Sequence, residues 1–188
     1  LYVALTSTHS PVVPNKRFQG KTNIGSYGDF VVETDWVAGQ VMKAVDDAKI
    51  KDKTLFLFTT DNGAAQFNRK TKSGKTHLSS GPYRGRKRDN WEGGHRVPFI
   101  ARWPGVVEST TVSSTVLCLT DLTRTLVAAA GGEITRHDMA EDSFSFLPAL
   151  KDDASGTAIP GNLLRRESTV HHGSSGEFAI RVGDWVYL

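Results

Sequence analysis

A short apolar run that stops at a polar tripeptide is the feature that most constrains the fold of this chain. Residues 54–60 are continuously apolar or β-branched, which predicts a strand covered on both of its faces. Asp61-Asn62-Gly63 follows at once and ends the strand. Strands of this kind are typical of proteins in which helices and a sheet form separate layers.

The segments on either side of this run fit the same architecture. Residues 1–5 predict another apolar strand, and residues 29–49 carry one apolar stripe at helical spacing. Residues 97–103 predict a further strand, and residues 120–130 a helix that Asp121 helps to cap. This order of elements predicts an α/β fold with a mainly parallel sheet.

The pattern changes towards the end of the chain. Two strand-like segments, residues 178–182 and 185–188, flank a short Gly-Asp turn, which predicts an antiparallel hairpin. We therefore expect residues 1–150 to form the α/β domain. Residues 151–188 are expected to form a linker and the start of a small antiparallel C-terminal subdomain.

Composition places the chain among ordinary globular proteins. Of its 188 residues, 38% are hydrophobic and 23% are charged, which excludes a disordered tail, a collagen-like repeat and a disulfide-rich miniprotein. It has no apolar run of about 20 residues, the length that a membrane span requires. The formal charge of +3 is too small to indicate nucleic-acid binding.

The apolar segments at both ends suggest an internal fragment cut within strands.

The end of the 54–60 strand is the first candidate site. Ligands of α/β sheets bind outside the carboxyl ends of the strands. Asp61 and Asn62 offer hard oxygen donors there, which suit Ca²⁺ or Mg²⁺ rather than zinc. An ordinary turn is the alternative, because the same tripeptide is good turn chemistry.

A basic stretch supplies the second candidate site. Residues 64–90 predict a long polar loop, and residues 84–88 within it contain four cations beside a glycine. Such a cluster can hold a small tetrahedral anion through charge-assisted hydrogen bonds. A solvated basic loop is the alternative. A nucleic-acid groove is disfavoured because few aromatic residues are near enough for stacking.

Histidine and cysteine provide further candidates. His9 follows the 1–5 strand and is a candidate proton donor or anion contact, with an ordinary loop residue as the alternative. His171-His172 suggests a metal site, but adjacent histidines rarely chelate one ion without other ligands. Cys118, the single cysteine, lies among apolar residues and is interpreted as a core residue rather than a nucleophile.

Taken together, these segments resemble the later motifs of the type I sulfatases, the arylsulfatase family. The resemblance rests on residues 5–11 (LTSTHSP), 59–63 (TTDNG) and 84–98 (RGRKRDNWEGGHRVP), in that order. The stretch from the lysine to Trp-Glu-Gly-Gly is the most specific part. Residues 103–105, 120–122 and 178–185 extend the resemblance over nearly the whole chain.

The resemblance implies a sulfuric ester hydrolase of alkaline-phosphatase-like fold. Members convert a cysteine or serine, in a Cys/Ser-x-Pro-x-Arg motif, to formylglycine, whose hydrated aldehyde attacks sulfur. Asp61 and Asn62 resemble calcium ligands, Lys87 the lysine that contacts the sulfate, and His9 the histidine beside the ester oxygen. A cation and a lysine would neutralise charge on the sulfate oxygens, and a protonated His9 or Lys87 would give a proton to the departing oxygen.

Three residues around this motif are candidates for substrate specificity. We hypothesise that Asp89, His95 and Arg96 face the sugar or aryl group of the substrate, with turn scaffolding as the alternative. The catalytic roles above require that the metal pair, the lysine and the histidine converge on a common pocket, although they are far apart in the sequence.

The remaining expectations concern what lies outside the chain. We expect the nucleophile motif and two further metal-binding aspartates upstream of residue 1. Residues 1–188 alone are therefore expected to hydrolyse no sulfate ester and to bind calcium weakly. The resemblance also implies an exported protein (periplasmic, extracellular or lysosomal) that acts on a sulfated small molecule or glycan.

Two other functions stay open. One is a phosphatase or phosphodiesterase of the same superfamily, although Asp61-Asn62 beside a single lysine fits one hard cation better than paired transition metals. The other is a catalytically dead sulfatase relative that uses the basic stretch to bind acidic glycans or another protein. The nucleophile motif would distinguish these functions.

Overall fold

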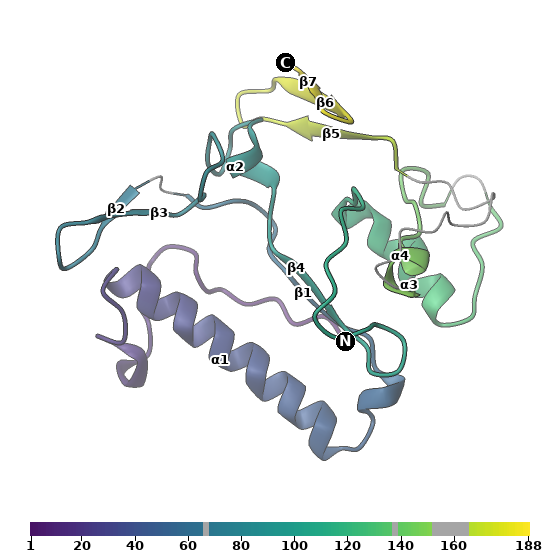
Figure 1. The fold of residues 1–188 in the computed structure, drawn as a ribbon, viewed down its shortest axis with the longest axis horizontal. Coiled ribbons are helices and arrows are strands. Elements are labelled where there is room, and N and C mark those ends of the chain that lie inside the picture. Colours follow the sequence, from purple (N-terminus) through teal and green to yellow (C-terminus); the bar gives the residue numbers. More distant parts are fainter. Residues whose placement is uncertain (66–67, 137–138, 152–165) are drawn as a thin grey trace. The chain divides into compact units, whose positions relative to one another are not determined.

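The chain divides into two compact units (Figure 1). The computed structural model describes residues 1–65, 68–136, 139–151 and 166–188, with one unit over Leu1–Ile100 and the other over Ala101–Leu188. In the described parts, no helix combines the length and the apolarity needed to span a membrane.

The first unit is built around one long helix and several short elements. In chain order these are η1 (Lys16–Phe18), α1 (Ser26–Asp47), η2 (Lys51–Lys53), β1 (Phe56–Thr59), β2 (Asn68–Lys70), β3 (Thr76–Leu78), α2 (Glu92–His95) and β4 (Phe99–Arg102), whose first two residues belong to this unit. β1 pairs with β4, and β2 pairs with β3 in an antiparallel hairpin. The predicted metal pair, Asp61 and Asn62, follows the end of β1 after one residue.

The helix predicted over residues 29–49 is confirmed as α1. Its first turn contains Asp29, which is only 4% exposed. The carboxylate accepts hydrogen bonds from the backbone N–H groups of Gly20 (2.7 Å) and Thr22 (2.8 Å), and so fixes the loop that precedes the helix. Burial alone would raise the pKa of Asp29, but these hydrogen bonds, the Thr22 hydroxyl and the charge of Lys72 together lower it.

The strand predictions had mixed outcomes. The strands at residues 54–60 and 97–103 are confirmed as the shorter β1 and β4. The strand predicted at residues 1–5 is wrong, because these residues form no strand and their side chains are largely exposed. An apolar run becomes a strand only where a neighbour completes its hydrogen bonds, and no described strand pairs with this segment. The loop predicted over residues 64–90 contains the β2–β3 hairpin.

The second unit ends in a three-stranded sheet. Its elements are η3 (Leu119–Asp121), α3 (Leu122–Ala129), α4 (Leu147–Lys151), β5 (Ser168–His172), β6 (Phe178–Val182) and β7 (Trp185–Tyr187). The predicted hairpin is confirmed, since β6 and β7 pair antiparallel with Val182 opposite Trp185. β5, which the sequence did not predict, completes the sheet on the other side of β6. The predicted linker falls mostly on residues 152–165, outside the described residues.

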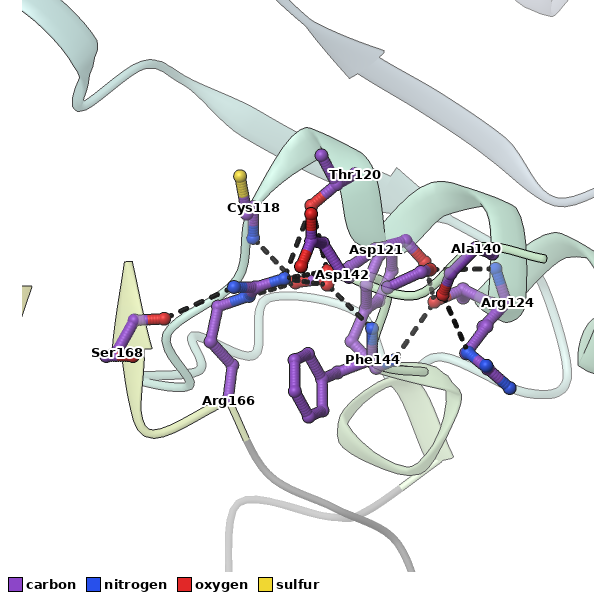
Figure 2. A network of polar contacts seen from close by, with 12 residues as sticks. Cys118, Thr120, Asp121, Arg124, Ala140, Asp142, Phe144, Arg166 and Ser168 are labelled. Atoms are coloured by element: carbon purple, nitrogen blue, oxygen red, sulfur yellow. Dashed lines mark hydrogen bonds and ion pairs between the residues drawn. The ribbon is translucent and has the colours of Figure 1, made fainter. Parts of the chain in front are cut away.

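A buried ion pair organises the helical part of this unit (Figure 2). Asp121, predicted as a helix cap, is 1% exposed and accepts hydrogen bonds from the backbone N–H groups of Cys118 (2.7 Å) and Phe144 (2.8 Å). Arg166 binds the same carboxylate through two of its nitrogens. The hydrogen bond to Asp121 raises the pKa of Arg166, while burial opposes the shift. The aspartate thus caps η3 through the Cys118 N–H, in line with the predicted cap, and it also connects three segments.

Candidate active site

Two oxygen-bearing side chains follow β1 at the predicted position. Asp61 is exposed, and no hydrogen bond or ion pair of its carboxylate occurs within the described part of the chain. Asn62 is half-buried, and its Nδ2 donates to the carbonyl of Gly63 at 3.2 Å, which leaves its amide oxygen as an acceptor. The Thr60 hydroxyl donates to the Asn62 carbonyl at 3.1 Å and shapes the turn. The pair therefore presents two hard oxygen donors.

The loop that carries Lys87 is hydrogen-bonded to the residues immediately after this pair. The backbone N–H of Lys87 donates to the Ala64 carbonyl at 2.8 Å, and the backbone N–H of Gly63 donates to the Gly94 carbonyl at 2.8 Å. A third bond, from the Gly93 N–H to the Arg84 carbonyl at 2.7 Å, closes the loop on itself. Asp61-Asn62 and Lys87, although distant in sequence, are thus joined through adjacent backbone.

Glycines make this close approach of backbones possible. A β-carbon on Gly63 would collide with the carbonyl oxygen of Gly93, and one on Gly93 would collide with the carbonyl of Gly85. Gly94 is equally confined, by the carbonyl of Asp89. Gly85 is buried and has φ of +86°, a conformation that favours glycine. The Trp-Glu-Gly-Gly stretch therefore has a steric explanation.

Lys87 differs from two arginines nearby, whose guanidinium groups lie over aromatic rings. The guanidinium of Arg84 lies over the Trp91 ring, 3.7 Å from its centroid, and Arg96 lies over Tyr83 at 4.8 Å. The half-buried Lys87 side chain has no hydrogen bond or ion pair with any residue that the structure describes. A half-buried lysine without a counter-charge in the described part of the chain is suited to an anionic ligand.

His9 lies on an exposed loop after residues 1–6. The ring Nδ1 of His9 is 2.9 Å from the Ser10 carbonyl, and the backbone N–H of His9 donates to the Thr6 carbonyl at 3.0 Å. The loop is tied to α1 by a 2.8 Å hydrogen bond from the Thr34 hydroxyl to Ser7. These contacts link His9 to its own loop, so its convergence with the metal pair and the lysine stays a prediction.

The three predicted specificity residues all contact their own loop. Asp89 accepts a hydrogen bond from the Arg86 N–H at 3.0 Å, and His95 Nε2 lies 2.9 Å from the Asn90 carbonyl. Arg96 forms an ion pair with Glu92 at 3.1 Å. These contacts agree with the scaffolding alternative, and the substrate-facing roles stay predictions.

The donor set suits part of a calcium site. Over the described ranges, no group of three His, Cys, Asp or Glu side chains is close enough together to hold a metal ion. Asp61 and Asn62 supply a carboxylate and an amide oxygen, the donor types that Ca²⁺ takes, but Ca²⁺ needs about six to eight oxygens. The pair therefore fits as a contributor to a calcium site that requires further ligands.

One stretch of this chain has the spacing of the nucleophile motif, although the nucleophile itself is expected outside residues 1–188. Residues 80–84 (Ser-Gly-Pro-Tyr-Arg) fit the spacing Cys/Ser-x-Pro-x-Arg. The Ser80 hydroxyl oxygen is buried and has no hydrogen-bond partner among the residues that the structure describes. A nucleophile must be able to reach the ester, so this burial argues against Ser80 in that role.

Sequence reasoning missed two structural groups. The ion pair between Asp121 and Arg166 left no local signal, because its members are 45 positions apart. The role of Asp29 was also missed, although an aspartate in the first turn of a predicted helix was a usable signal.

Comparison with known proteins gives a consistent result. Residues 1–132 match the family model for sulfatases. The chain is 36% identical to human arylsulfatase H over 158 residues, covering 82% of the chain and 27% of that protein. It is 38% identical to human N-acetylgalactosamine-6-sulfatase over 175 residues, covering 93% and 31%. It is 31% identical to the N-acetylgalactosamine-6-O-sulfatase of Bacteroides thetaiotaomicron over 196 residues, covering 100% and 36%.

Solved structures agree with this match. A structure from work on glycosaminoglycan metabolism by Bacteroides thetaiotaomicron superposes with a TM-score of 0.79 at 30% identity, covering 97% of this chain and 37% of that one. The PsFucS1 sulfatase from Pseudoalteromonas gives 0.75 at 26% identity, covering 96% and 34%. The predicted α/β, alkaline-phosphatase-like fold is thereby confirmed. The chain spans 27% to 36% of the length of the three curated relatives above.

Proposed function

Because this chain belongs to the sulfatase family, we propose that it forms part of the catalytic domain of a sulfuric ester hydrolase. In this proposal residues 1–150 contribute to the catalytic α/β domain, and residues 151–188 are a linker and the first hairpin of a small C-terminal subdomain. The substrate is a sulfated small molecule or glycan, and the protein is exported.

The observation that carries the proposal is the backbone connection between the metal pair and the lysine. Hydrogen bonds from Lys87 to Ala64 and from Gly63 to Gly94 hold the two segments at fixed separation. A sulfate ester carries negative charge on its oxygens, and that charge must be stabilised as the sulfur is attacked. Positive groups held in advance by rigid backbone give such stabilisation without reorganisation during the reaction.

Each residue of the proposed site then has one task. Asp61 and Asn62 would hold Ca²⁺, with Mg²⁺ as the alternative, and the ion would supply Lewis-acid stabilisation of the sulfate oxygens. The Lys87 ammonium group binds a sulfate oxygen directly. A protonated His9 gives a proton to the departing alcohol oxygen, which is otherwise a poor leaving group.

The family's formylglycine would supply the nucleophile that attacks sulfur. We propose that it comes from a Cys/Ser-x-Pro-x-Arg motif outside residues 1–188, since the Ser80 hydroxyl oxygen is buried. This chain's own part is to bind and orient the sulfate and to provide the proton for the leaving group.

The test is hydrolysis of 4-methylumbelliferyl sulfate by the full-length protein with calcium present. Lys87→Ala should lower kcat/KM by about 10²–10³-fold, the usual cost of one transition-state charge contact. Lys53→Ala removes an exposed lysine of η2 as the matched control and should leave kcat/KM unchanged. Chelation of calcium should abolish turnover, and added calcium should restore it.

Two results would overturn the proposal. One is equal activity of the Lys87→Ala and wild-type proteins. The other is a preference for 4-methylumbelliferyl phosphate over the sulfate, which would point to the phosphatase alternative.

A further inference from the structure

The basic residues of the chain are concentrated in a stretch that contains no acidic residue. Residues 62–88 hold eight Lys or Arg and no Asp or Glu. The rest of the chain has 15 basic residues against 20 acidic ones, so its formal charge is negative. Of the eight basic residues in this stretch, the proposed catalysis uses only Lys87. A separate explanation is needed for the lysines near its middle.

Three of these lysines lie on the β2–β3 hairpin, whose turn is held by its own hydrogen bonds. The Thr71 N–H donates to the Lys75 carbonyl at 2.8 Å, and the Gly74 N–H donates to the Thr71 carbonyl at 2.9 Å. Lys70 Nζ donates to the Thr76 hydroxyl across the strands at 3.1 Å. Lys70, Lys72 and Lys75 are all exposed. Three exposed lysines therefore lie on one hairpin whose turn is fixed by backbone hydrogen bonds.

A second segment adds a fourth lysine. The backbone N–H of Lys72 donates to the Asn23 carbonyl at 2.7 Å. This bond joins the hairpin turn to the loop that carries the exposed Lys21. The charge of Lys72 helps to lower the pKa of the Asp29 carboxyl. Asp29 itself is only 4% exposed, and its oxygens accept hydrogen bonds from backbone N–H groups of the preceding loop. None of the four lysines forms an ion pair with an acidic residue that the structure describes.

We propose that Lys21, Lys70, Lys72 and Lys75 form a hairpin surface that binds a polyanionic polysaccharide, a chain with repeated sulfate or carboxylate groups. The inference rests on the proposed function and narrows its substrate to a sulfate ester on such a chain. Lysines are flexible point charges, which suit anions repeated along a polymer. The hairpin surface would hold neighbouring sugars while one ester is hydrolysed.

The composition of the hairpin favours this partner over two others. Single-stranded nucleic acid is bound by stacking on aromatic rings, and the described residues of the hairpin include no Phe, Tyr or Trp. Stable binding to a membrane surface combines basic charge with apolar side chains that insert, and Leu78, at 55% exposed, is the one large apolar residue of β2 and β3.

The experiment measures binding of a chondroitin sulfate decasaccharide to the full-length protein over a series of NaCl concentrations. Lys72→Gln/Lys75→Gln removes two exposed charges from the hairpin surface. Lys51→Gln/Lys53→Gln removes two exposed charges from η2 and is the matched control. The first variant should raise Kd by about 3- to 10-fold. By the counterion-release argument it should also reduce the slope of log K against log salt by about two. The control should match the wild-type protein.

The outcomes separate the hairpin surface from the proposed function. Equal losses in both double variants, or no loss in either, overturn the hairpin surface. Equal or tighter binding of a single-stranded oligonucleotide of the same charge overturns the choice of a polysaccharide. If wild-type protein binds the decasaccharide through the hairpin but hydrolyses no sulfate ester, the proposed function fails and the hairpin surface stands.

Discussion

Arg166 forms a bidentate ion pair with the carboxylate of Asp121, with Nη2 2.6 Å from Oδ1 and Nε 2.9 Å from Oδ2. The side chains are 10% and 2% exposed, so both charges are largely removed from water. The same guanidinium donates to the carbonyls of Asp142 and Ser168. Because the guanidinium has these hydrogen-bond partners, the ion pair connects the segment before β5 to the start of α3.

Removal of one partner from this pair should be costly. Arg166→Met leaves a buried carboxylate without its counter-charge, so the free energy of unfolding should fall by about 3–5 kcal/mol. Lys43→Met breaks the exposed ion pair with Asp47 on α1 and should cost about 0.5 kcal/mol or less. Urea unfolding followed by tryptophan fluorescence compares the two. Similar costs for both variants would contradict a structural role for the buried pair.

The lowered pKa of Asp29 predicts a stability effect at acid pH. The ordinary pKa is 3.8, and the folded value lies below it, so the ionised form is favoured by folding. This stabilisation is complete above about pH 4 and is lost as the pH falls through the folded pKa. Asp29→Asn should therefore be less stable than wild type at pH 6, and the difference should shrink below pH 3.8. A difference that stays constant over this range would argue against the assignment.

The glycine contacts predict opposite effects of one substitution at two sites. Gly63→Ala places a methyl group against the Gly93 carbonyl, so it should destabilise the loop by about 1–3 kcal/mol and lower sulfatase activity. Gly39→Ala, in α1 with open space around it, should instead stabilise the protein by about 0.5–1 kcal/mol. Thermal unfolding and turnover of both variants check this. An active, stable Gly63→Ala protein would show that the two backbones are not in contact.

Ser80 separates the two possible locations of the nucleophile. If the nucleophile lies outside residues 1–188, Ser80→Ala should retain wild-type turnover of 4-methylumbelliferyl sulfate. Since the buried Ser80 oxygen has no described partner, removing it should also leave stability unchanged or slightly increased. Loss of all turnover in a folded Ser80→Ala protein would instead assign the nucleophile to this residue.

Local patterns allowed the sequence to predict some of these features. The run that became β1, the stripe of α1 and the β6–β7 turn each depend on neighbours within a few positions, and all three are confirmed. The run at residues 1–5 has the same local pattern as β1, but its state depends on a distant partner strand. The 45 positions between Asp121 and Arg166 pose the same problem, since no local pattern marks a contact between remote segments.

The candidate site shows the same limit. Hard oxygen donors and a cationic loop are visible in residue types, so Asp61, Asn62 and Lys87 could be proposed directly. Their connection depends on backbone hydrogen bonds between residues 63–64 and the loop over residues 87–94, which residue types do not encode. The glycines were visible as part of a motif, but the carbonyl groups against which they lie were not.

The backbone-to-backbone contact at Gly63, Gly93 and Gly94 has an evolutionary consequence. The position of Lys87 is set by main-chain atoms, and those atoms are identical whichever side chains the loop displays. Tyr83, Arg84 and Arg96 can therefore be exchanged for other residues without displacing the backbone of Lys87. A loop built in this way can change its exposed side chains while the backbone that carries Lys87 keeps its place.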